Sequence, residues 1–250
     1  MSPEEQNQES LTERAAEFIT HSRKMVVFTG AGISTESGIP DFRSPGGVWS
    51  KYDPNDFTIQ KFTNSAKTRR LVWEMMGKSG VMAKAEPNPA HHAIAELERL
   101  GKLDCIITQN VDNLHQIAGN SPDRVFELHG NMRWARCLNC NRRYPLERVA
   151  ETAQAITEAP ECPSCRGILK PGAVFFGETL PYDTLSRATE HSRSCDVFVV
   201  IGSTLTVNLS PTPMDRQASV LIRSKAGEAV PPIIDRVKAK LESHRRQRIK

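Results

Sequence analysis

The 250-residue sequence has little that would tie it to a membrane, a secretory route or nucleic acid. No apolar run approaches the roughly 20 residues that a membrane-spanning helix needs, and the N-terminus lacks the basic-then-apolar order of a secretory signal. A net charge of +4 is too mild to indicate nucleic-acid binding. We therefore expect a cytoplasmic globular protein with no membrane partner, and nucleic acid is not an expected partner.

Two common hydrolytic motifs are also missing. The chain has no HExxH zinc motif and no GxSxG nucleophile turn, so neither a metalloprotease-type zinc nor a serine hydrolase site is indicated. The chemistry of an active site would then come largely from a cofactor, which the protein binds and orients.

Only six cysteines are present, and in a reducing compartment they are not expected to form disulfides. Cys105 and Cys195 lie within or beside apolar runs and are expected to be core residues. The other four form two Cys-x-x-Cys pairs: Cys137 with Cys140, and Cys162 with Cys165. Two such pairs suit a closed, structural Cys₄ zinc site, because no ligand position is left for water. A redox dithiol is the alternative, but neither pair adjoins a βα turn.

The stretch from Met25 to Arg43, MVVFTGAGISTESGIPDFR, organises the rest of the chain. Residues 25–29 are apolar and β-branched, which indicates a buried strand, and Gly30-Ala31-Gly32 follows at once. Two glycines after a strand permit a sharp turn and leave N–H groups free for an anion, as in dinucleotide-binding turns. Thr35, however, stands where that fingerprint has a third small residue. A tight turn without a ligand therefore remains an alternative.

Three further apolar runs predict buried strands at 105–108, 125–128 and 197–201. Polar residues leave the end of each: Gln109-Asn110-Val111-Asp112, His129-Gly130 and Gly202-Ser203-Thr204. Open α/β sheets bind ligands at the carboxyl ends of their strands, so a site is expected at this rim. His129 is the candidate general base, because a neutral imidazole accepts a proton near physiological pH. A hydrogen-bonded core histidine is the alternative.

Several motifs in a fixed order resemble the sirtuins, the NAD-dependent protein deacylases. They are GAGIS and GIPDFR near the N-terminus, TQNVDNLH at 108–115, LHG at 128–130, the two cysteine pairs, PGAVFFGE at 171–178 and IGST at 201–204. The resemblance covers most of residues 10–235. It implies NAD and one structural Zn²⁺ as cofactors and an acyl-lysine protein or peptide as substrate, with transfer of the acyl group to ADP-ribose and release of nicotinamide.

The expected fold is α/β, a Rossmann-like parallel sheet with an inserted small domain. That domain would combine a helical module at 46–85 with a zinc ribbon at 131–169, and the sheet domain would comprise 10–45, 86–130 and 170–236. We expect residues 1–9 to be disordered, Ser10 and Glu13 to form the capping box of the first helix, and 237–250 to be a basic tail.

The resemblance also implies residue roles. Catalysis would rest on His129 and Asn110. The cofactor contacts would be Gly30, Ala31, Gly32, Thr35, Asp41, Phe42, Arg43, Gln109, Asn110, Asp112, His129, Gly202, Ser203, Asn208 and Ala226. Val174, Phe175, Phe176 and Gly177 would pair with an extended peptide. His91, His92 and His115 are interpreted as structural. The tyrosine and arginine of members that prefer acidic acyl groups correspond to Met76 and Ser79, so we expect removal of acetyl or longer apolar groups rather than succinyl.

One junction departs from the family. Val207 runs directly into Asn208, where sirtuins insert a helix and a further parallel strand. Either that piece is absent, or the printed sequence omits a segment here. We favour the omission, because losing a central strand and its helix should unfold a parallel sheet. Two other functions remain open: mono-ADP-ribosyl transfer to protein, and a non-catalytic NAD-binding zinc scaffold if the deletion is real.

Overall fold

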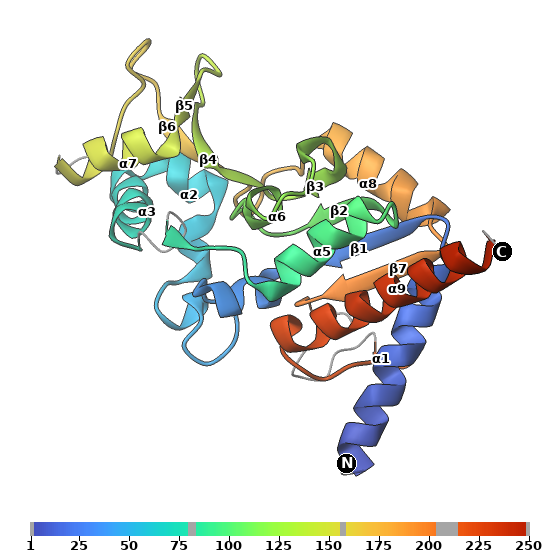
Figure 1. The fold of residues 1–250 in the computed structure, drawn as a ribbon. Helices are drawn as coiled ribbons and strands as arrows, with labels where there is room; N and C mark the ends of the chain where they lie inside the picture. Colours follow the sequence, from blue (N-terminus) through green and yellow to red (C-terminus); the bar gives the residue numbers. More distant parts are fainter. Residues whose placement is uncertain (1–2, 80–83, 156–158, 204–214, 249–250) are drawn as a thin grey trace.

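Four parallel strands form the sheet of the larger lobe in the computed structural model, which describes residues 3–79, 84–155, 159–203 and 215–248 (Figure 1). They are β1 (Met25–Thr29), β2 (Leu103–Thr108), β3 (Val125–Glu127) and β7 (Val197–Ile201), in the order β3-β2-β1-β7. Each was expected from its apolar, β-branched run, and β1 and β7 have the predicted bounds.

Helices cover both faces of this sheet (Figure 1). On one face, α1 (Pro3–His21), α5 (Pro89–Arg99) and α9 (Ala226–Arg248) enclose a core that includes Val27 and Ile106. On the other, α8 (Tyr182–Ser194) packs on Val26 and Ile107, the neighbours of those residues along the strands. Successive side chains of a strand point to opposite faces, so buried residues on both sides give the continuous apolar runs seen in the sequence.

The printed sequence is continuous through its 250 residues, so the interpretation that a segment is omitted after Val207 is wrong. The junction itself, with Asn208, lies in 204–214, outside the described residues. Among the described strands, β7 is at the edge of the sheet. Its Phe198 is 43% exposed and lies beside the ring of Phe28. An apolar side chain is therefore uncovered beside the edge where the family's further helix and strand would pack.

The smaller lobe combines the two predicted modules. Its antiparallel sheet has the order β5-β4-β6, from β4 (Gly130–Cys137), β5 (Arg143–Pro145) and β6 (Leu169–Ala173). Around it lie η2 (Val48–Ser50), η3 (Pro54–Phe57), α2 (Ile59–Asn64), α3 (Ala66–Ser79) and α7 (Leu146–Ala155). Trp73 of α3 is buried among residues of the ribbon, and its indole donates to the Leu169 carbonyl at 3.3 Å. One core thus joins the modules, as the predicted inserted domain requires.

The N-terminus differs from the prediction, whereas the basic C-terminal segment continues a helix as expected. Helix α1 begins at Pro3, so residues 3–9 are helical rather than disordered, and Ser10 lies inside the helix instead of capping it. Helix α9 continues to Arg248, so the expected basic tail at 237–250 is the end of this helix through Arg248. Lys240 of α9 pairs with Glu13 of α1 at 2.5 Å, and Arg236 contacts the same carboxylate at 3.1 Å. These ion pairs between segments distant in sequence hold the two helices together.

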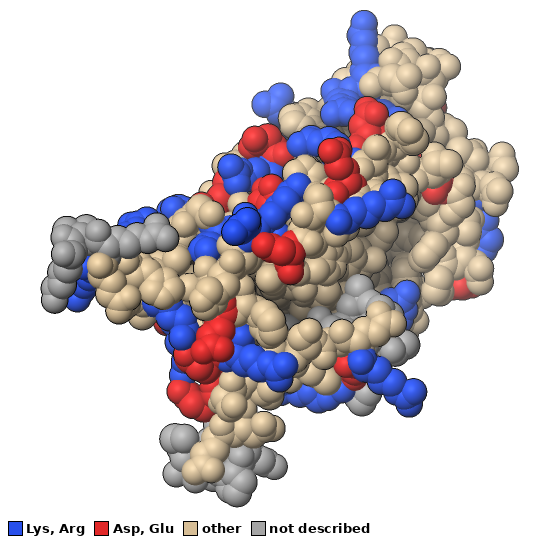
Figure 2. Space-filling model, turned by 90° about the vertical axis from the view of Figure 1, so that its right-hand side faces the viewer, with Lys and Arg blue, Asp and Glu red and all other residues tan. Residues whose placement is uncertain are grey.

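Short helical turns complete the described elements: η1 (Ala31–Ser37), α6 (Leu114–Ile117), η4 (Pro122–Arg124) and η5 (Asp215–Gln217). None of the described helices combines the length and apolar character that crossing a bilayer requires. Lysine and arginine side chains are interspersed with aspartate and glutamate over the face in Figure 2, in keeping with the mild net charge.

Candidate active site

The carboxyl ends of the parallel strands bring the predicted polar residues together. Thr29 of β1 pairs with Thr108 of β2 and with Ile201 of β7, so Gly30, Gln109 and Gly202 emerge side by side. The backbone N–H of Gln109 donates to the Thr29 carbonyl at 3.0 Å, which extends the hydrogen bonding between β1 and β2 by one residue. The rim predicted from the strand ends is therefore present.

The glycine turn is packed more tightly than expected. The N–H of Gly30 donates to the Ile201 carbonyl and that of Gly32 to the Gly202 carbonyl, at 3.1 and 2.8 Å. The expectation that these N–H groups are free for an anion is therefore wrong. A Cβ on Gly32 would lie 2.8 Å from the Gly202 backbone, and Gly202 itself has φ +62°. The glycines are required because two backbone turns lie directly against each other.

Asn110, Ser34 and Asp112 form a hydrogen-bonded group just inside the rim. The Asn110 amide donates to the Gly30 carbonyl at 3.2 Å and to the Ser34 hydroxyl at 3.1 Å. The Ser34 hydroxyl donates to the Asp112 carboxylate at 2.7 Å, and the Leu114 N–H donates to the same carboxylate at 2.9 Å. Burial raises the pKa of the Asp112 carboxyl, although its hydrogen bonds oppose the shift. The group fixes the orientation of the Asn110 amide.

Ser34 was missed by the sequence analysis, although it stands in the GAGIS motif. It is 1% exposed and connects η1 to both residues that follow β2. A serine in a glycine-rich turn gives no period or spacing that separates this role from that of an ordinary turn residue. Only the approach of a distant strand end reveals it.

His129 lies between the two lobes, after β3 and before β4. Its Nδ1 is 3.0 Å from the Gln109 carbonyl oxygen, and a carbonyl can only accept, so Nδ1 carries the proton. In the neutral ring the lone pair is therefore on Nε2. The next residue, Gly130, has φ +76°, and a Cβ there would lie 2.2 Å from the Gly172 carbonyl oxygen. This close contact with Gly172 in β6 constrains the backbone next to His129.

The loop after η1 carries Phe42 at its surface. Both oxygens of the Asp41 carboxylate accept hydrogen bonds within the loop, including one from the Arg43 N–H at 3.0 Å, which makes Asp41 an organiser of this turn. Phe42 is 41% exposed, and its ring centroid is 5.2 Å from that of Trp49. Arg43 is exposed, and the Thr35 hydroxyl donates back to the Gly32 carbonyl at 2.9 Å.

The predicted peptide segment is already partly paired within the chain. The Phe176 N–H donates to the Phe57 carbonyl and its carbonyl accepts from the Ile59 N–H, at 3.0 and 2.9 Å. The Val174 N–H donates to the His129 carbonyl at 2.8 Å. The expectation that the whole segment Val174–Gly177 pairs with a substrate backbone is therefore wrong at Phe176. The Phe176 side chain, by contrast, is 51% exposed and lies 5.9 Å from Trp49, centroid to centroid.

The remaining predicted cofactor residues are spread along the rim and its far side. Ser203 is buried, and its hydroxyl lies 3.4 Å from the side-chain oxygen of Gln109. Ala31 is half-buried in η1. Ala226 begins α9 in the same core cluster as Ile33 of η1, so its side chain faces the core.

Three histidines were interpreted as structural. His115 is buried, and its Nε2 is 2.9 Å from the Thr29 hydroxyl. Burial lowers the pKa of His115 well below its usual value, and that of His91 to about 4. The two rings lie 5.1 Å apart within the protein, whereas His92 is exposed. None of the three directly follows a strand end at the rim, as His129 does.

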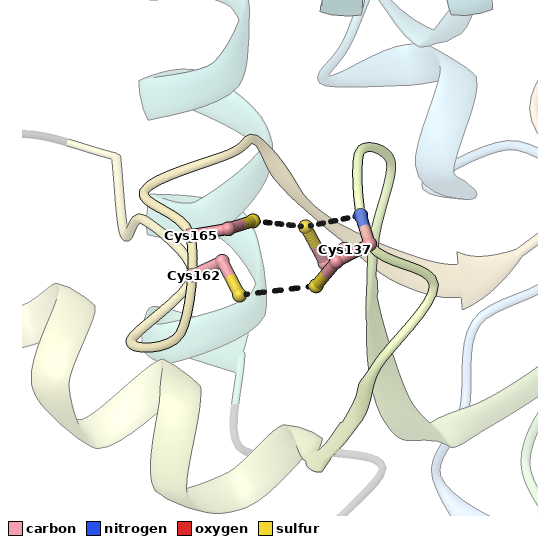
Figure 3. A group of neighbouring side chains, drawn as sticks. Cys137, Cys162 and Cys165 are labelled. Carbon is pink, nitrogen blue, oxygen red and sulfur yellow. Dashed lines mark hydrogen bonds between the residues drawn. The ribbon is translucent and has the colours of Figure 1, made fainter.

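The four paired cysteines converge in the smaller lobe, with their sulfur atoms all within 4.8 Å of one another (Figure 3). The Sγ atoms of Cys137 and Cys165 are 3.5 Å apart, and those of Cys140 and Cys162 are 3.7 Å apart. Tetrahedral zinc with Zn–S bonds of about 2.3 Å requires sulfurs about 3.8 Å apart. The residues therefore fit a closed zinc site. Neither pair lies against a βα turn, so the dithiol alternative has no support.

The chain resembles curated proteins over most of its length. The family model described as "Sir2 family" matches residues 30–209. A protein named NAD-dependent protein deacetylase from Rhodopseudomonas palustris is 40% identical, with 89% of this chain and 95% of that protein covered. One named NAD-dependent protein deacylase 2 from Archaeoglobus fulgidus is 42% identical, with 90% of this chain and 95% of that protein covered.

Solved structures match equally well. One described under the mechanism and regulation of Sir2 enzymes has a TM-score of 0.81 at 41% identity, covering 93% of this chain and 99% of that one. Sir2Af2 bound to a myristoylated histone peptide has a TM-score of 0.75 at 37% identity, covering 94% and 99%.

The alignments also show that this chain is shorter internally. The alignment with the R. palustris protein spans 243 positions but takes in 89% of 250 residues, about 222, so about 20 positions have no residue here. The A. fulgidus alignment spans 246 positions and 90% of this chain, about 225 residues, which gives a similar shortfall.

Proposed function

The chain belongs to the Sir2 family, and from that premise we propose that it is an NAD-dependent protein deacylase acting on acyl-lysine. When bound at the rim, NAD would supply an electrophilic ribose carbon, with nicotinamide as its leaving group, for the acyl oxygen of the substrate. The observation that carries the assignment is the orientation of His129, whose unprotonated Nε2 is left available at the rim. Without the Nε2 lone pair of His129, the rim could still bind a nucleotide but would have no general base.

The other residues of the rim have supporting roles in this proposal. Nε2 of His129 accepts the proton of a ribose hydroxyl, which increases the nucleophilicity of that oxygen. Asn110 and Asp112, fixed by Ser34, orient the carboxamide and ribose. Gln109 would bind ribose hydroxyls, and Ser203, whose hydroxyl lies 3.4 Å from the Gln109 side-chain oxygen, would contact the adenosine. Arg43 adds positive charge for the pyrophosphate. Asn208, outside the described residues, keeps its predicted adenosine contact as a proposal only.

The acyl group is proposed to be acetyl or a longer apolar chain. Phe42, Trp49 and Phe176 form a row of rings with centroid separations of 5.2 and 5.9 Å, which connects the cofactor loop to the peptide segment. Such a wall favours an apolar acyl chain over a carboxylate. The side chains of Met76 and Ser79, on which the argument against succinyl rests, lie outside the described residues.

The test is a peptide panel with acetyl-, myristoyl- and succinyl-lysine, each with and without NAD. Mass spectrometry should find acyl-ADP-ribose and nicotinamide in equal amounts, with the succinyl peptide slowest. Label from NAD that ends on a protein instead of on a free acyl product would support the mono-ADP-ribosyl transfer alternative. Deacylation without NAD would refute the proposal.

A second candidate, the non-catalytic NAD-binding scaffold, is favoured by the missing positions. About 20 residues are absent, and the junction after Val207 is where a helix and strand are expected in this family. Calorimetric titration with NAD, compared with product formation on the same sample, separates the candidates. NAD binding together with turnover supports the enzyme, whereas binding without turnover on any peptide of the panel supports the scaffold.

A further inference from the structure

A second group of metal-type ligands lies near the opposite end of β2 from the active site. The ligand atoms of Asp104, Cys105 and His191 are all within 4.8 Å of one another. We propose that these three residues form a second transition-metal site that binds Zn²⁺, with water in the fourth ligand position. This site is separate from the four-cysteine site, and the proposed deacylation does not use it.

An irregularity in β2 brings two adjacent residues to one face of the sheet. Met25 pairs with Leu103 and Val26 with Cys105, so Asp104 is an extra residue in the ladder. In a regular strand, side chains two residues apart point to the same face of the sheet. Here Leu103 packs with the α5 and α9 core, whereas Cys105 packs with the α8 core on the opposite face. A bulge of this kind re-aims a side chain, and here it directs Asp104 toward the same helix as Cys105.

Helix α8 supplies the third ligand. Nδ1 of His191, in its last turn, lies 2.5 Å from a carboxylate oxygen of Asp104. Cys195 caps the helix four residues later and packs against the cluster that contains Cys105. The Cys195 thiol donates to the Ser192 carbonyl at 3.2 Å and is not counted among the ligands. The set is one imidazole, one carboxylate and one sulfur, which are ligand types that tetrahedral zinc uses.

The surroundings leave an entrance from solvent. The side chains of Asp104 and His191 are 25% and 26% exposed, whereas Cys105 is 1% exposed. The ion would therefore enter past the carboxylate and imidazole and reach the buried sulfur. Lys24 competes for the site, because its ammonium lies 3.7 Å from the Asp104 carboxylate. It also contacts the Ser194 hydroxyl at 2.6 Å, which can retain the ammonium when a metal takes the carboxylate.

The alternative is that Asp104 and His191 form only a hydrogen bond between sheet and helix. Metal content decides between the two. The full chain, purified under a phosphine reductant, is dialysed against Zn²⁺ and then against metal-free buffer, and zinc is measured per chain. We expect two zinc ions in the unaltered protein, one in the His191→Gln variant and two in His92→Gln, a matched change at an exposed histidine.

Cobalt titration gives a second readout that a merely structural role would not change. The Co²⁺-loaded protein should lose one set of thiolate charge-transfer bands in Cys105→Ala and keep the set from the Cys137 site. Circular dichroism of each variant shows whether it is folded, and His191→Gln, on a partly exposed side chain, serves where Cys105→Ala does not fold. One zinc per unaltered chain, or two zinc ions retained in His191→Gln, would overturn the proposal.

Discussion

Nδ1 of His129 donates a hydrogen bond to the carbonyl oxygen of Gln109, 3.0 Å away, and this contact links the ends of two neighbouring parallel strands. Because the donor is fixed by a backbone carbonyl, the tautomer does not depend on any other side chain. In the neutral ring the lone pair is thereby placed on Nε2 before a substrate binds. The fold itself, rather than a second catalytic carboxylate, orients the proposed base.

Removal of zinc from the four-cysteine site should unfold the smaller lobe before the larger one. Metal binding contributes folding free energy, and the cysteines join the strands of the ribbon, whereas the larger lobe has its own core. Hydrogen exchange measured with and without a chelator should show faster exchange in β4, β6 and α7 and unchanged exchange in β1 and β2. Equal loss of protection in both lobes would contradict this.

Acid should destabilise the protein through His91. Its folded pKa is lowered to about 4 by burial, below its unfolded value of 6.5, so the unfolded state binds more protons between these values. The stabilising contribution is present above pH 6.5 and is lost as the pH falls toward 4, by at most about 3 kcal/mol. Urea unfolding from pH 7 to 4 measures the slope.

His91→Leu should reduce this slope, because neither ring nitrogen of His91 has a hydrogen-bond partner within the described residues. His92→Leu, at an exposed position, is the control and should keep the slope of the unaltered protein. Parallel curves for the two variants would show that His91 does not carry the effect. His115 is also buried with a lowered pKa, so the His91→Leu variant should still lose stability with falling pH, with a smaller slope than the unaltered protein.

The buried ion pair of Lys170 and Glu178 should be needed for the peptide segment. The ammonium lies 3.0 Å from the Glu178 carboxylate and 4.3 Å from the centre of the Phe175 ring, and the same carboxylate accepts from the Phe175 N–H at 2.7 Å. Lys170→Met leaves the partly exposed Glu178 carboxylate without its cation, which should lower the unfolding free energy by about 1–3 kcal/mol.

A double-mutant cycle tests this pair. Lys170→Met with Glu178→Gln should recover part of the loss, since no charge is then left unpaired. Denaturant unfolding of both single variants and the double variant gives the coupling. Strictly additive losses would mean that the two side chains act independently.

The exposed Phe198 ring on β7 should make the protein prone to self-association. Phe198 is 43% exposed, and an exposed aromatic side chain favours contact with apolar surfaces of other molecules. Phe198→Lys should raise the highest protein concentration at which light scattering still gives the mass of a monomer. Leu185→Lys, at a similarly exposed position on α8, should have less effect. An equal effect of both changes would point to general surface charge instead.

The sequence predicted the strands and the rim well because both follow from local patterns. Residues 25–29 and 197–201 are short apolar runs followed by polar residues, and parallel strands place those residues at one edge. The spacing of the two Cys-x-x-Cys pairs is likewise a local pattern that predicts a four-cysteine zinc site. The family motifs added the cofactor, which no periodicity reveals.

The failures share a physical cause, since each depends on contacts between distant segments. The N–H groups of Gly30 and Gly32 are taken by the end of β7, and Phe176 is taken by the chain around α2. The first helix begins early because carboxylates of α1 pair with cations of α9, more than 200 residues away in sequence. The extra residue at Asp104 is equally invisible in a run that looks like a regular strand.

The central claim is tested most directly by single-turnover deacetylation in the His129→Ala variant, with NAD binding measured on the same sample and His92→Ala as control. The account predicts that His129→Ala retains NAD binding within a few-fold while deacetylation falls by a factor of about 10² or more, as expected for loss of a general base. Deacetylation by His129→Ala at the rate of the control would contradict the account.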